Sequence, residues 1–295
     1  MQRLVDDALL YAPTERRLLL LGEPGTGKTM LSQAIHNASK RAKGPFVPFN
    51  VNACDSHLLR SQWFGHKKGA FTGATADHTG VFEQADGGTL FLDEILDIPA
   101  SEQGVLLEAL QFRTFTRLGD DKVSTSDCRL IFGTNRSLVD ARSDGERWRL
   151  DFLSRLGLCH FTVPPLRERL EDLPAFVTRF VDEVCAADGR DEVPAVSDRT
   201  LRELAGRPWP ANVRDLYFTI ESALPRCREG ELLPEHLPPP LGVPRVEEIV
   251  ALDERIRAWV VSAIIACGGN KSEAARLLGI GKMRLYRILG GETEE

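Results

Sequence analysis

Eight consecutive residues near the start of the sequence have the types and spacing that bind a phosphate chain. They match the pattern GxxxxGK followed by Ser or Thr in full. The glycines let backbone N–H groups curl around phosphate oxygens, the lysine can reach the β and γ phosphates, and the final hydroxyl can ligate magnesium. The alternative, a glycine-rich turn with an accidental lysine, is disfavoured by the strand-like run before it and the helix-like run after it. The predicted nucleotide ligands are Gly22, Glu23, Pro24, Gly25, Thr26, Gly27, Lys28 and Thr29.

A pair of acidic residues could complete a hydrolytic site. Asp93 and Glu94 directly follow the apolar run Leu90-Phe91-Leu92, which is typical of a strand buried on both faces. Asp93 then stands where a buried strand emerges, so its carboxylate can face a magnesium ion. Glu94 can orient and deprotonate an attacking water, which predicts hydrolysis of ATP rather than phosphoryl transfer to a substrate. Two exposed acids at the end of a strand are the alternative interpretation.

The end of the sequence has the pattern of a DNA-binding helix pair. Residues 270–280 predict a helix that Asn270 or Ser272 caps and that Gly279 ends, since glycine tolerates a positive φ. A second helix is predicted over 282–289. This is helix-turn-helix geometry, in which the last helix enters the major groove of DNA; a helical cap with a solvated basic face is the alternative. The predicted DNA-binding residues are Lys271, Lys282, Arg284 and Arg287.

Three regions of different character must position these groups. In the first half, short apolar runs alternate with amphipathic stretches, which predicts an α/β fold with a parallel sheet flanked by helices. The next region has a helical pattern, as over 172–185 and 197–205, and predicts a subdomain without strands. A proline-rich segment then predicts a semi-rigid linker. The predicted domains are 1–163 (α/β nucleotide-binding), 164–237 (helical lid), 238–246 (linker) and 247–295 (all-α, DNA-binding).

Charge and composition limit the class of protein. The chain has 295 residues, a formal net charge of -6 and 42% hydrophobic residues, as ordinary soluble globular proteins do. Acidity argues against a nucleic-acid partner, but residues 270–290 contain five basic residues and one acidic residue. Six cysteines without a CxxC pair indicate reduced thiols and no zinc site. Without a signal segment or an apolar run of about 18 residues, we expect a cytoplasmic protein that does not enter a membrane.

Between the two nucleotide motifs lies a loop with one aromatic side chain among small residues. By itself it predicts a flexible surface loop. Its sequence, however, resembles the GAFTGA loop of the bacterial enhancer-binding proteins. These are AAA+ ATPases that remodel RNA polymerase carrying sigma-54, and many of them end in a Fis-type helix-turn-helix. The resemblance implies that the following residues contact the sigma factor: Gly69, Ala70, Phe71, Thr72, Gly73 and Ala74.

The resemblance covers almost the whole chain and implies further residues that respond to the γ phosphate. Asn135 is similar to the family's first sensor. Arg214, in the segment 209–216, is similar to the second sensor. Asn50 falls where the family has an asparagine that restrains the catalytic glutamate, and Asn52 is a competing candidate.

The resemblance also implies assembly into a ring, which in the family is a hexamer. Residues 148–156 are similar to the segment that carries the family's arginine fingers. Arg149 and Arg155 occupy its two arginine positions and would neutralise charge on the ATP of a neighbouring subunit. The sequence does not decide which of them is the main finger.

Several positions depart from the family pattern. Thr29 replaces the common glutamate and Ala211 replaces a usual glycine. Arg60, Gln62 and Lys67 replace the acidic residues that often precede the GAFTGA loop, which makes its stem more basic. The chain also begins close to the phosphate loop. Either a separate protein regulates it, or this start is a truncation.

We expect an ATP-hydrolysing activator that binds upstream DNA and remodels sigma-54 RNA polymerase to open promoters. Two rivals remain. One is a DNA-binding regulator that uses nucleotide only as an assembly ligand. The other is an AAA+ remodeller of some other protein, with the DNA module as a tether.

Overall fold

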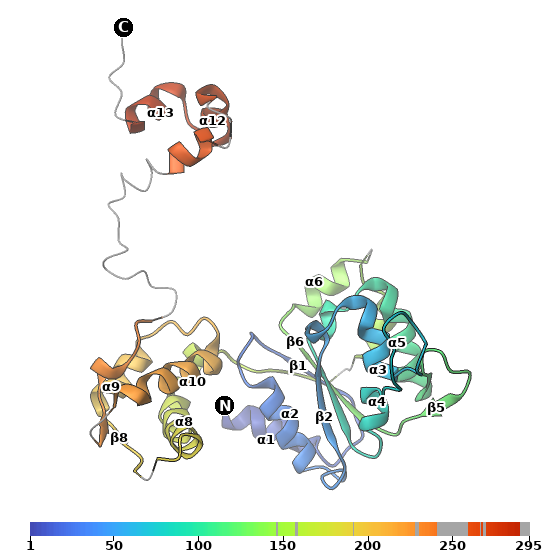
Figure 1. Cartoon of the computed structure of the whole chain (residues 1–295). Helices are drawn as coiled ribbons and strands as arrows, with labels where there is room; N and C mark the ends of the chain where they lie inside the picture. The colour runs from blue at the N-terminus through green and yellow to red at the C-terminus, as the bar shows by residue number, and fades with distance from the viewer. Residues whose placement is uncertain are drawn as a thin grey trace. The chain divides into compact units, whose positions relative to one another are not determined.

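The chain forms two compact units, Met1–Pro238 and Pro239–Glu295 (Figure 1). The computed structural model describes residues 1–145, 147–156, 159–190, 192–227, 230–240, 259–265, 267 and 270–289. Most of the predicted linker 238–246 and the start of the predicted DNA-binding domain therefore lie outside the described residues.

A five-stranded parallel sheet forms the centre of the first unit, in the order β2-β3-β6-β1-β7. The predicted parallel α/β arrangement is confirmed. Because all the strands run in one direction, their carboxyl ends meet at one edge of the sheet. The strands are β1 (Leu18–Leu21), β2 (Phe46–Asn50), β3 (Thr89–Asp93), β6 (Arg129–Thr134) and β7 (Cys159–Thr162).

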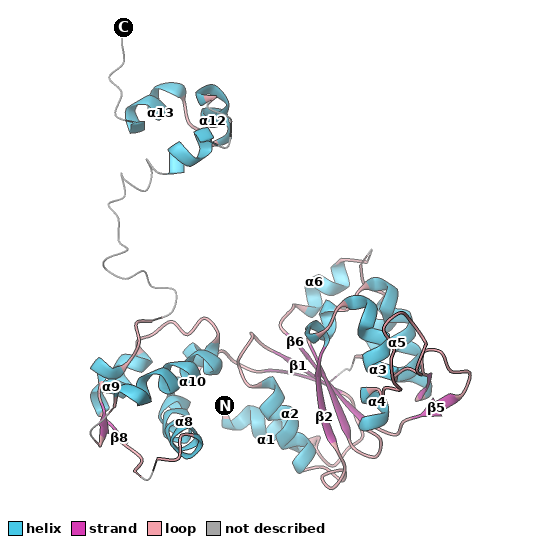
Figure 2. Ribbon diagram, viewed as in Figure 1, coloured by secondary structure: helices cyan, strands magenta, loops and turns pink. Residues whose placement is uncertain are grey.

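Helices cover both faces of this sheet (Figure 2). Successive strand side chains point to opposite faces, so Leu18 and Leu20 join the core beneath α1 (Gln2–Leu10) and α2 (Lys28–Asn37), whereas Leu19 joins the core on the other face. Burial on both faces explains the uninterrupted apolar runs. The second face carries α3 (Leu59–Phe64), α4 (Val81–Gln84), α5 (Ala100–Phe112), α6 (Leu138–Ser143) and α7 (Leu150–Arg155).

A helical subdomain with its own core follows the sheet. It contains α8 (Leu173–Ala187), α9 (Asp198–Ala205) and α10 (Asn212–Ala223). The expectation of no strands was wrong, because β8 (Ala195–Val196) and β9 (Glu231–Leu232) form a short parallel pair. Two-residue strands are too short to leave a periodic sequence signal.

Short elements complete the first unit. A hairpin of β4 (Thr114–Thr116) and β5 (Val123–Thr125) follows α5. The 3-10 turns are η1 (Val51–Ala53), η2 (Ser56–Leu58), η3 (Ile95–Asp97), η4 (Leu166–Glu168), η5 (Leu170–Asp172), η6 (Leu224–Arg226) and η7 (Pro234–His236).

The second unit is helical. Residues 259–265 form a helix, and α12 (Lys271–Leu277) and α13 (Lys282–Leu289) follow. Asn270 is the N-cap of α12, since its side chain accepts from the amides of Ser272 and Glu273 at 3.1 and 3.2 Å. Gly279 has a φ of 65°, which permits the turn before α13. Val260, Ala274, Ala275 and Leu285 form its small core.

Within the described residues, no helix is long and apolar enough to cross a bilayer.

Candidate active site

The phosphate loop joins the buried strand β1 to the N-terminus of α2. β1 ends at Leu21 and α2 begins at Lys28, so the loop has the context that the sequence predicted. Gly25 and Gly27 adopt φ angles of 76° and 98°, which are favourable only without a Cβ. The Lys28 ammonium donates to the carbonyl oxygen of Gly22 at 2.9 Å.

A cavity of about 270 Å³ lies against this loop. Lys28, Asp93 and Arg214 all line it, so it brings together predicted ligands from the loop, from the end of β3 and from the lid. A lysine and free amides at a helix N-terminus favour a polyphosphate, and the Thr29 hydroxyl and Asp93 carboxylate are oxygen ligands of the kind magnesium prefers. The residues present fit both ATP and magnesium. The other lining residues are Gly25, Gly27, Thr29, Met30, Phe180, Val213 and Tyr217.

Gly133 is a residue of this site that the sequence motifs did not single out. It lies in β6 beside β3, and a Cβ built on it would stand 2.3 Å from Oδ1 of Asp93. A side chain at this position would displace the carboxylate or the strand. A glycine inside an otherwise apolar buried strand is the signal that could have found it.

Glu94 follows β3 in a left-handed backbone conformation, with φ 55° and ψ 41°. Such a conformation costs a non-glycine residue about 1–2 kcal/mol and often marks a functional site. The carboxylate accepts a hydrogen bond from the backbone N–H of Asn135 at 3.0 Å and lies 3.6 Å from the Lys28 ammonium. Burial raises the pKa of Glu94 above the usual glutamate range; Lys28 opposes the rise and Asp93 adds to it. A carboxylate so placed is a candidate general base.

The two asparagines at the end of β2 make other contacts. Asn50 lies opposite Asp93 in the β2–β3 register, but its side chain accepts from the amide of Asn52 at 2.8 Å. The Asn52 side chain donates to Asp97 at 2.7 Å. Neither side chain contacts Glu94, so the glutamate restraint predicted for Asn50 is absent from this arrangement. The backbone of Asn135 provides a restraint instead.

Glu23 faces the lid rather than the cavity. Arg167 in η4 donates to both of its carboxylate oxygens, at 2.6 and 2.8 Å. The hydrogen bonds from Arg167 and then from Asn212 lower the pKa of Glu23 to about 2. The sequence motifs had assigned Glu23 to the nucleotide, and they gave no sign of this pair.

Alanine at position 211 does not alter the turn before Arg214. Ala211 has a φ of -108°, which any residue adopts. The left-handed positions of this turn are Trp209 and Asn212, with φ angles of 47° and 56°.

Both predicted arginine fingers lie at the ends of α7 and are exposed. Arg149 precedes the helix and pairs with Asp151, with nitrogen–oxygen distances of 2.8 and 3.1 Å. Arg155 is the last residue of the helix. Neither is among the residues that line the cavity of its own chain.

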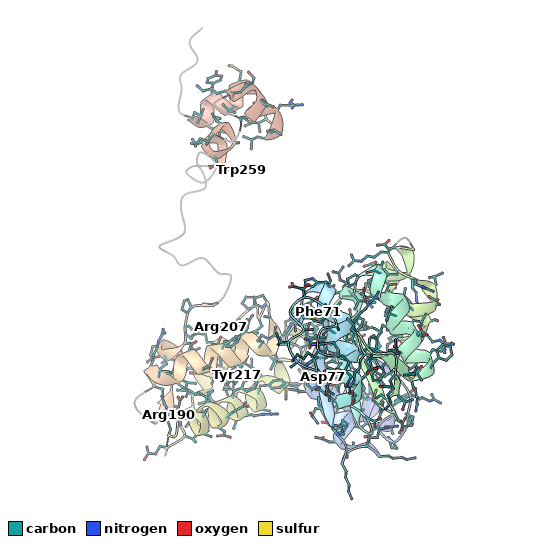
Figure 3. The ribbon with its side chains drawn as sticks, turned by 45° about the vertical axis from the view of Figure 1, so that its right-hand side comes forward. Phe71, Asp77, Arg190, Arg207, Tyr217 and Trp259 are labelled. Carbon is teal, nitrogen blue, oxygen red and sulfur yellow. The ribbon has the colours of Figure 1, made fainter. Side chains whose placement is uncertain are left out.

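The GAFTGA segment is a closed turn. The amide of Gly69 donates to the carbonyl of Ala74 at 2.8 Å, and the amide of Ala74 donates to that of Phe71 at 3.0 Å. Phe71 is half-buried, with its ring edge-on to His66 at a centroid distance of 4.9 Å (Figure 3). The Phe71 ring therefore packs against His66 in the stem of its own loop.

The basic stem of this loop is held by one carboxylate. Asp77 accepts from the Lys67 ammonium at 3.0 Å and from the amide of Lys68 at 2.8 Å. Arg60, another basic residue of the stem, pairs instead with Glu102 at 2.7 Å. Local carboxylates thus partly neutralise the basic character that the sequence indicated.

In the second unit, α13 carries three of the four predicted DNA-binding residues. The side chains of Lys282, Arg284 and Arg287 lie outside what the structure describes. The Lys271 ammonium lies 5.2 Å from the centroid of the Tyr286 ring.

Three family models match successive parts of the chain. Residues 1–162 match the sigma-54 interaction domain, residues 167–248 match the AAA+ ATPase lid domain, and residues 261–289 match the Fis family of bacterial regulatory proteins. The chain belongs to the sigma-54 interaction domain family. The resemblance to sigma-54-dependent activators is confirmed, as is the fold: an AAA+ P-loop domain, a helical lid and a C-terminal Fis-type helix-turn-helix.

This sigma-54 interaction domain protein is similar to several bacterial regulators over nearly its whole length. It is 39% identical to the transcriptional regulatory protein ZraR of Escherichia coli K12 and 38% identical to the Nif-specific regulatory protein of Azotobacter vinelandii, over 98% of the chain in each case. It spans 66% of the length of ZraR and 56% of that of the Nif regulator. A crystal structure of NtrX from Brucella abortus with ATP matches 98% of the chain and 67% of NtrX, with a TM-score of 0.72 and 28% identity.

We expect Glu94→Gln to stabilise the nucleotide-free chain at neutral pH. Because the pKa of Glu94 is raised in the folded state, the folded chain keeps this proton to a higher pH than the unfolded chain. The free energy of unfolding therefore falls as the pH rises through the interval between the unfolded-state pKa and the folded-state pKa of Glu94. Glutamine has no such loss. Urea unfolding should give similar midpoints for variant and parent at the acid end of the interval and a higher midpoint for the variant at neutral pH.

Glu108→Gln, at an exposed position of α5, is the control for the change in net charge. A Glu94→Gln chain less stable than the parent at neutral pH would show that the Lys28 ion pair outweighs the cost of burying the charge.

Proposed function

We propose that this protein is an ATP-hydrolysing activator that remodels sigma-54 RNA polymerase and opens promoters. The single observation that carries the proposal is the meeting of the phosphate loop, Asp93 and Glu94 at one edge of the sheet, in a chain with a GAFTGA loop between the two nucleotide motifs.

The chain's own residues divide the chemistry among them. The loop amides and Lys28 would hold the phosphates, and Thr29 and Asp93 would hold magnesium, which supplies charge neutralisation on the phosphate oxygens when bound. Within the described residues, no three His, Cys, Asp or Glu side chains form a metal cluster of their own, so the phosphates would complete the ligand set. Glu94 would take a proton from the attacking water, and Arg214 would sense the γ phosphate.

Glu94 is also the proposed link between hydrolysis and movement. Its carboxylate contacts Lys28 on one side and the amide of Asn135 on the other. A change at the γ phosphate would alter both contacts, with Asn50 as a further candidate partner of the glutamate. The resulting shift would move the loop around Phe71 between two states, as a two-state remodeller requires.

The ATP site would be completed by a neighbouring subunit in a ring, most simply a hexamer as the family resemblance implies. Arg149 and Arg155 are exposed and absent from the lining of their own chain's cavity, which suits a role in trans. The domain limits proposed are 1–163, 164–237, 238–246 and 247–295. Residues from 247 onward would bind double-stranded DNA, and the ring would act in the cytoplasm.

The test of the whole proposal is transcription in vitro with the purified chain, ATP and sigma-54 polymerase on a supercoiled template. Open complexes that require the chain, ATP hydrolysis and sigma-54 together are expected. Activity that is the same with the housekeeping sigma factor would contradict the proposal.

Single substitutions should separate ATP hydrolysis from remodelling of the polymerase. We expect Glu94→Gln to lower ATP turnover by about 100-fold or more because it removes the general base, while ATP binding remains. Phe71→Ala should keep ATP turnover and lose open-complex formation, and Phe112→Ala, at an exposed phenylalanine, should keep both.

Unchanged turnover in Glu94→Gln would favour nucleotide as an assembly ligand only. Open complexes formed by Phe71→Ala at the parent rate would favour remodelling of some other protein.

The arginine fingers can be tested by mixing subunits. Glu94→Gln and Arg149→Ala chains should each be inactive, but an interface between the intact Glu94 of one and the intact Arg149 of the other should hydrolyse ATP. An equal mixture should recover activity at about a quarter of the interfaces if subunits mix at random. The same experiment with Arg155→Ala identifies the main finger, and no recovery with either arginine variant would exclude action in trans.

Binding to DNA should depend on salt through α13. Each of Lys282→Gln, Arg284→Gln and Arg287→Gln should reduce the slope of log K against log salt by about one if the residue contacts a phosphate. Arg16→Gln, an exposed position in the first unit, makes the same charge change as a control. Slopes that match the parent for all three α13 variants would show that this helix does not contact DNA.

A further inference from the structure

Three consecutive peptide groups of the phosphate loop are held by donors from the lid. Each carbonyl oxygen accepts one hydrogen bond from a residue beyond position 165. The bonds join Pro24 O to the side-chain amide of Asn212 at 3.0 Å, Gly25 O to the backbone N–H of Val213 at 3.0 Å, and Thr26 O to the guanidinium of Arg169 at 2.6 Å.

Holding these carbonyls fixes where the next amides point. In a trans peptide, the C=O of one residue and the N–H of the following residue point in opposite directions, and no peptide bond in the described part of the chain is cis. The amides of Gly25, Thr26 and Gly27 therefore point away from the donors that hold the carbonyls. Of these, Thr26 makes one long bond, to Glu23 O at 3.4 Å, and Gly25 and Gly27 donate to no other group among the described residues. Successive backbone amides of this kind form an anion-binding nest, in which those of Gly25 and Gly27 remain free to donate to an anion.

The Asn212 side chain is itself fixed in place. It is 0% exposed, and its oxygen accepts from the amide of Leu166 at 2.8 Å while its nitrogen also donates to Glu23 at 3.1 Å. Asn212 has a left-handed backbone conformation, with a φ of 56°, and from it the side-chain amide reaches the carbonyl oxygen of Pro24. An unfavourable conformation is retained where the surrounding contacts compensate for it.

Arg169 is equally buried. It is 2% exposed, its guanidinium stands over the ring of Phe176 at 5.5 Å, and Asp172 lies 4.0 Å away. A buried guanidinium without a close bidentate carboxylate is costly, so its hydrogen bond to Thr26 O is one of few that offset this cost.

The contact leaves no room for a side chain at position 25. A Cβ on Gly25 would stand 2.1 Å from the carbonyl oxygen of Ala211. The glycine thus serves two purposes, a positive φ and the close approach of the lid backbone.

We propose that the lid presets the phosphate loop: Asn212 and Arg169 are positioning residues that turn its amides toward the phosphates before nucleotide arrives. This role differs from that proposed for Arg214, which would contact the γ phosphate itself. The inference rests on the proposed function, because it requires that the loop bind a phosphate chain.

The experiment measures equilibrium binding of ADP and of pyrophosphate to the full chain, pyrophosphate by competition against labelled ADP. Asn212→Gly removes the amide while glycine accepts the left-handed φ, and Arg169→Met removes the guanidinium while keeping an apolar stem. Arg169→Met loses the hydrogen bond to Thr26 O, and Asn212→Gly loses three side-chain hydrogen bonds, one of them to Pro24 O. Because each variant loses one hydrogen bond to a carbonyl of the loop, we expect affinity for both ligands to fall about tenfold. Matched controls are Arg113→Gly, an exposed left-handed position at the end of α5, and Arg179→Met, an exposed arginine of α8.

Each outcome decides one point. Equal losses of ADP and pyrophosphate affinity, with the controls unchanged, support presetting of the loop by the lid, because pyrophosphate has no base or ribose for the lid to recognise. Loss of ADP affinity alone would overturn it and assign these residues to the nucleoside. ADP affinity at the parent level in both variants would overturn presetting by the lid and leave the proposed function standing. A parent chain that binds neither ADP nor pyrophosphate would overturn the phosphate site itself. Since the two variants alter different elements, either one that folds suffices.

Discussion

All five strands of the central sheet run in the same direction, and the candidate site depends on that constraint. Parallel strands bring their carboxyl ends to one edge, where the first residues after each strand meet. Lys28 follows β1, Asp93 ends β3 and Asn135 follows β6, so groups far apart in the chain become neighbours. If β3 ran antiparallel to the other strands, Asp93 would lie at the edge opposite the phosphate loop.

The same edge is where polar groups are buried and must be satisfied. Lys28 is 5% exposed and Glu94 is 8% exposed, and their mutual contact is only partly compensating, since burial still raises the pKa of the glutamate. The raised pKa makes the Glu94 carboxylate a stronger base than an exposed carboxylate, so it accepts a proton more readily. The left-handed backbone at Glu94 adds strain at the same residue, so local stability is given up where the chemistry is expected.

The lid supplies the other half of the arrangement. A phosphate loop without outside contacts would have carbonyls and amides free to exchange their orientations, because glycine at 25 and 27 permits many backbone conformations. Hydrogen bonds from Asn212 and Arg169 remove that freedom. The acidic net charge of the chain does not oppose a DNA-binding role, because the segment 270–290, outside the first unit, contains five basic residues and one acidic residue.

The sequence by itself determined the strand–loop–helix that contains Lys28, the acidic pair after β3 and the family, since each is encoded by local pattern or by an unbroken motif. It did not predict Gly133 against Asp93, the pairing of Glu23 with Arg167 or the short β8–β9 pair. These depend on residues distant in the chain, and only the tertiary structure decides which distant side chains come within hydrogen-bonding distance. Motif spacing identifies which residue types are present, whereas packing decides which of them meet.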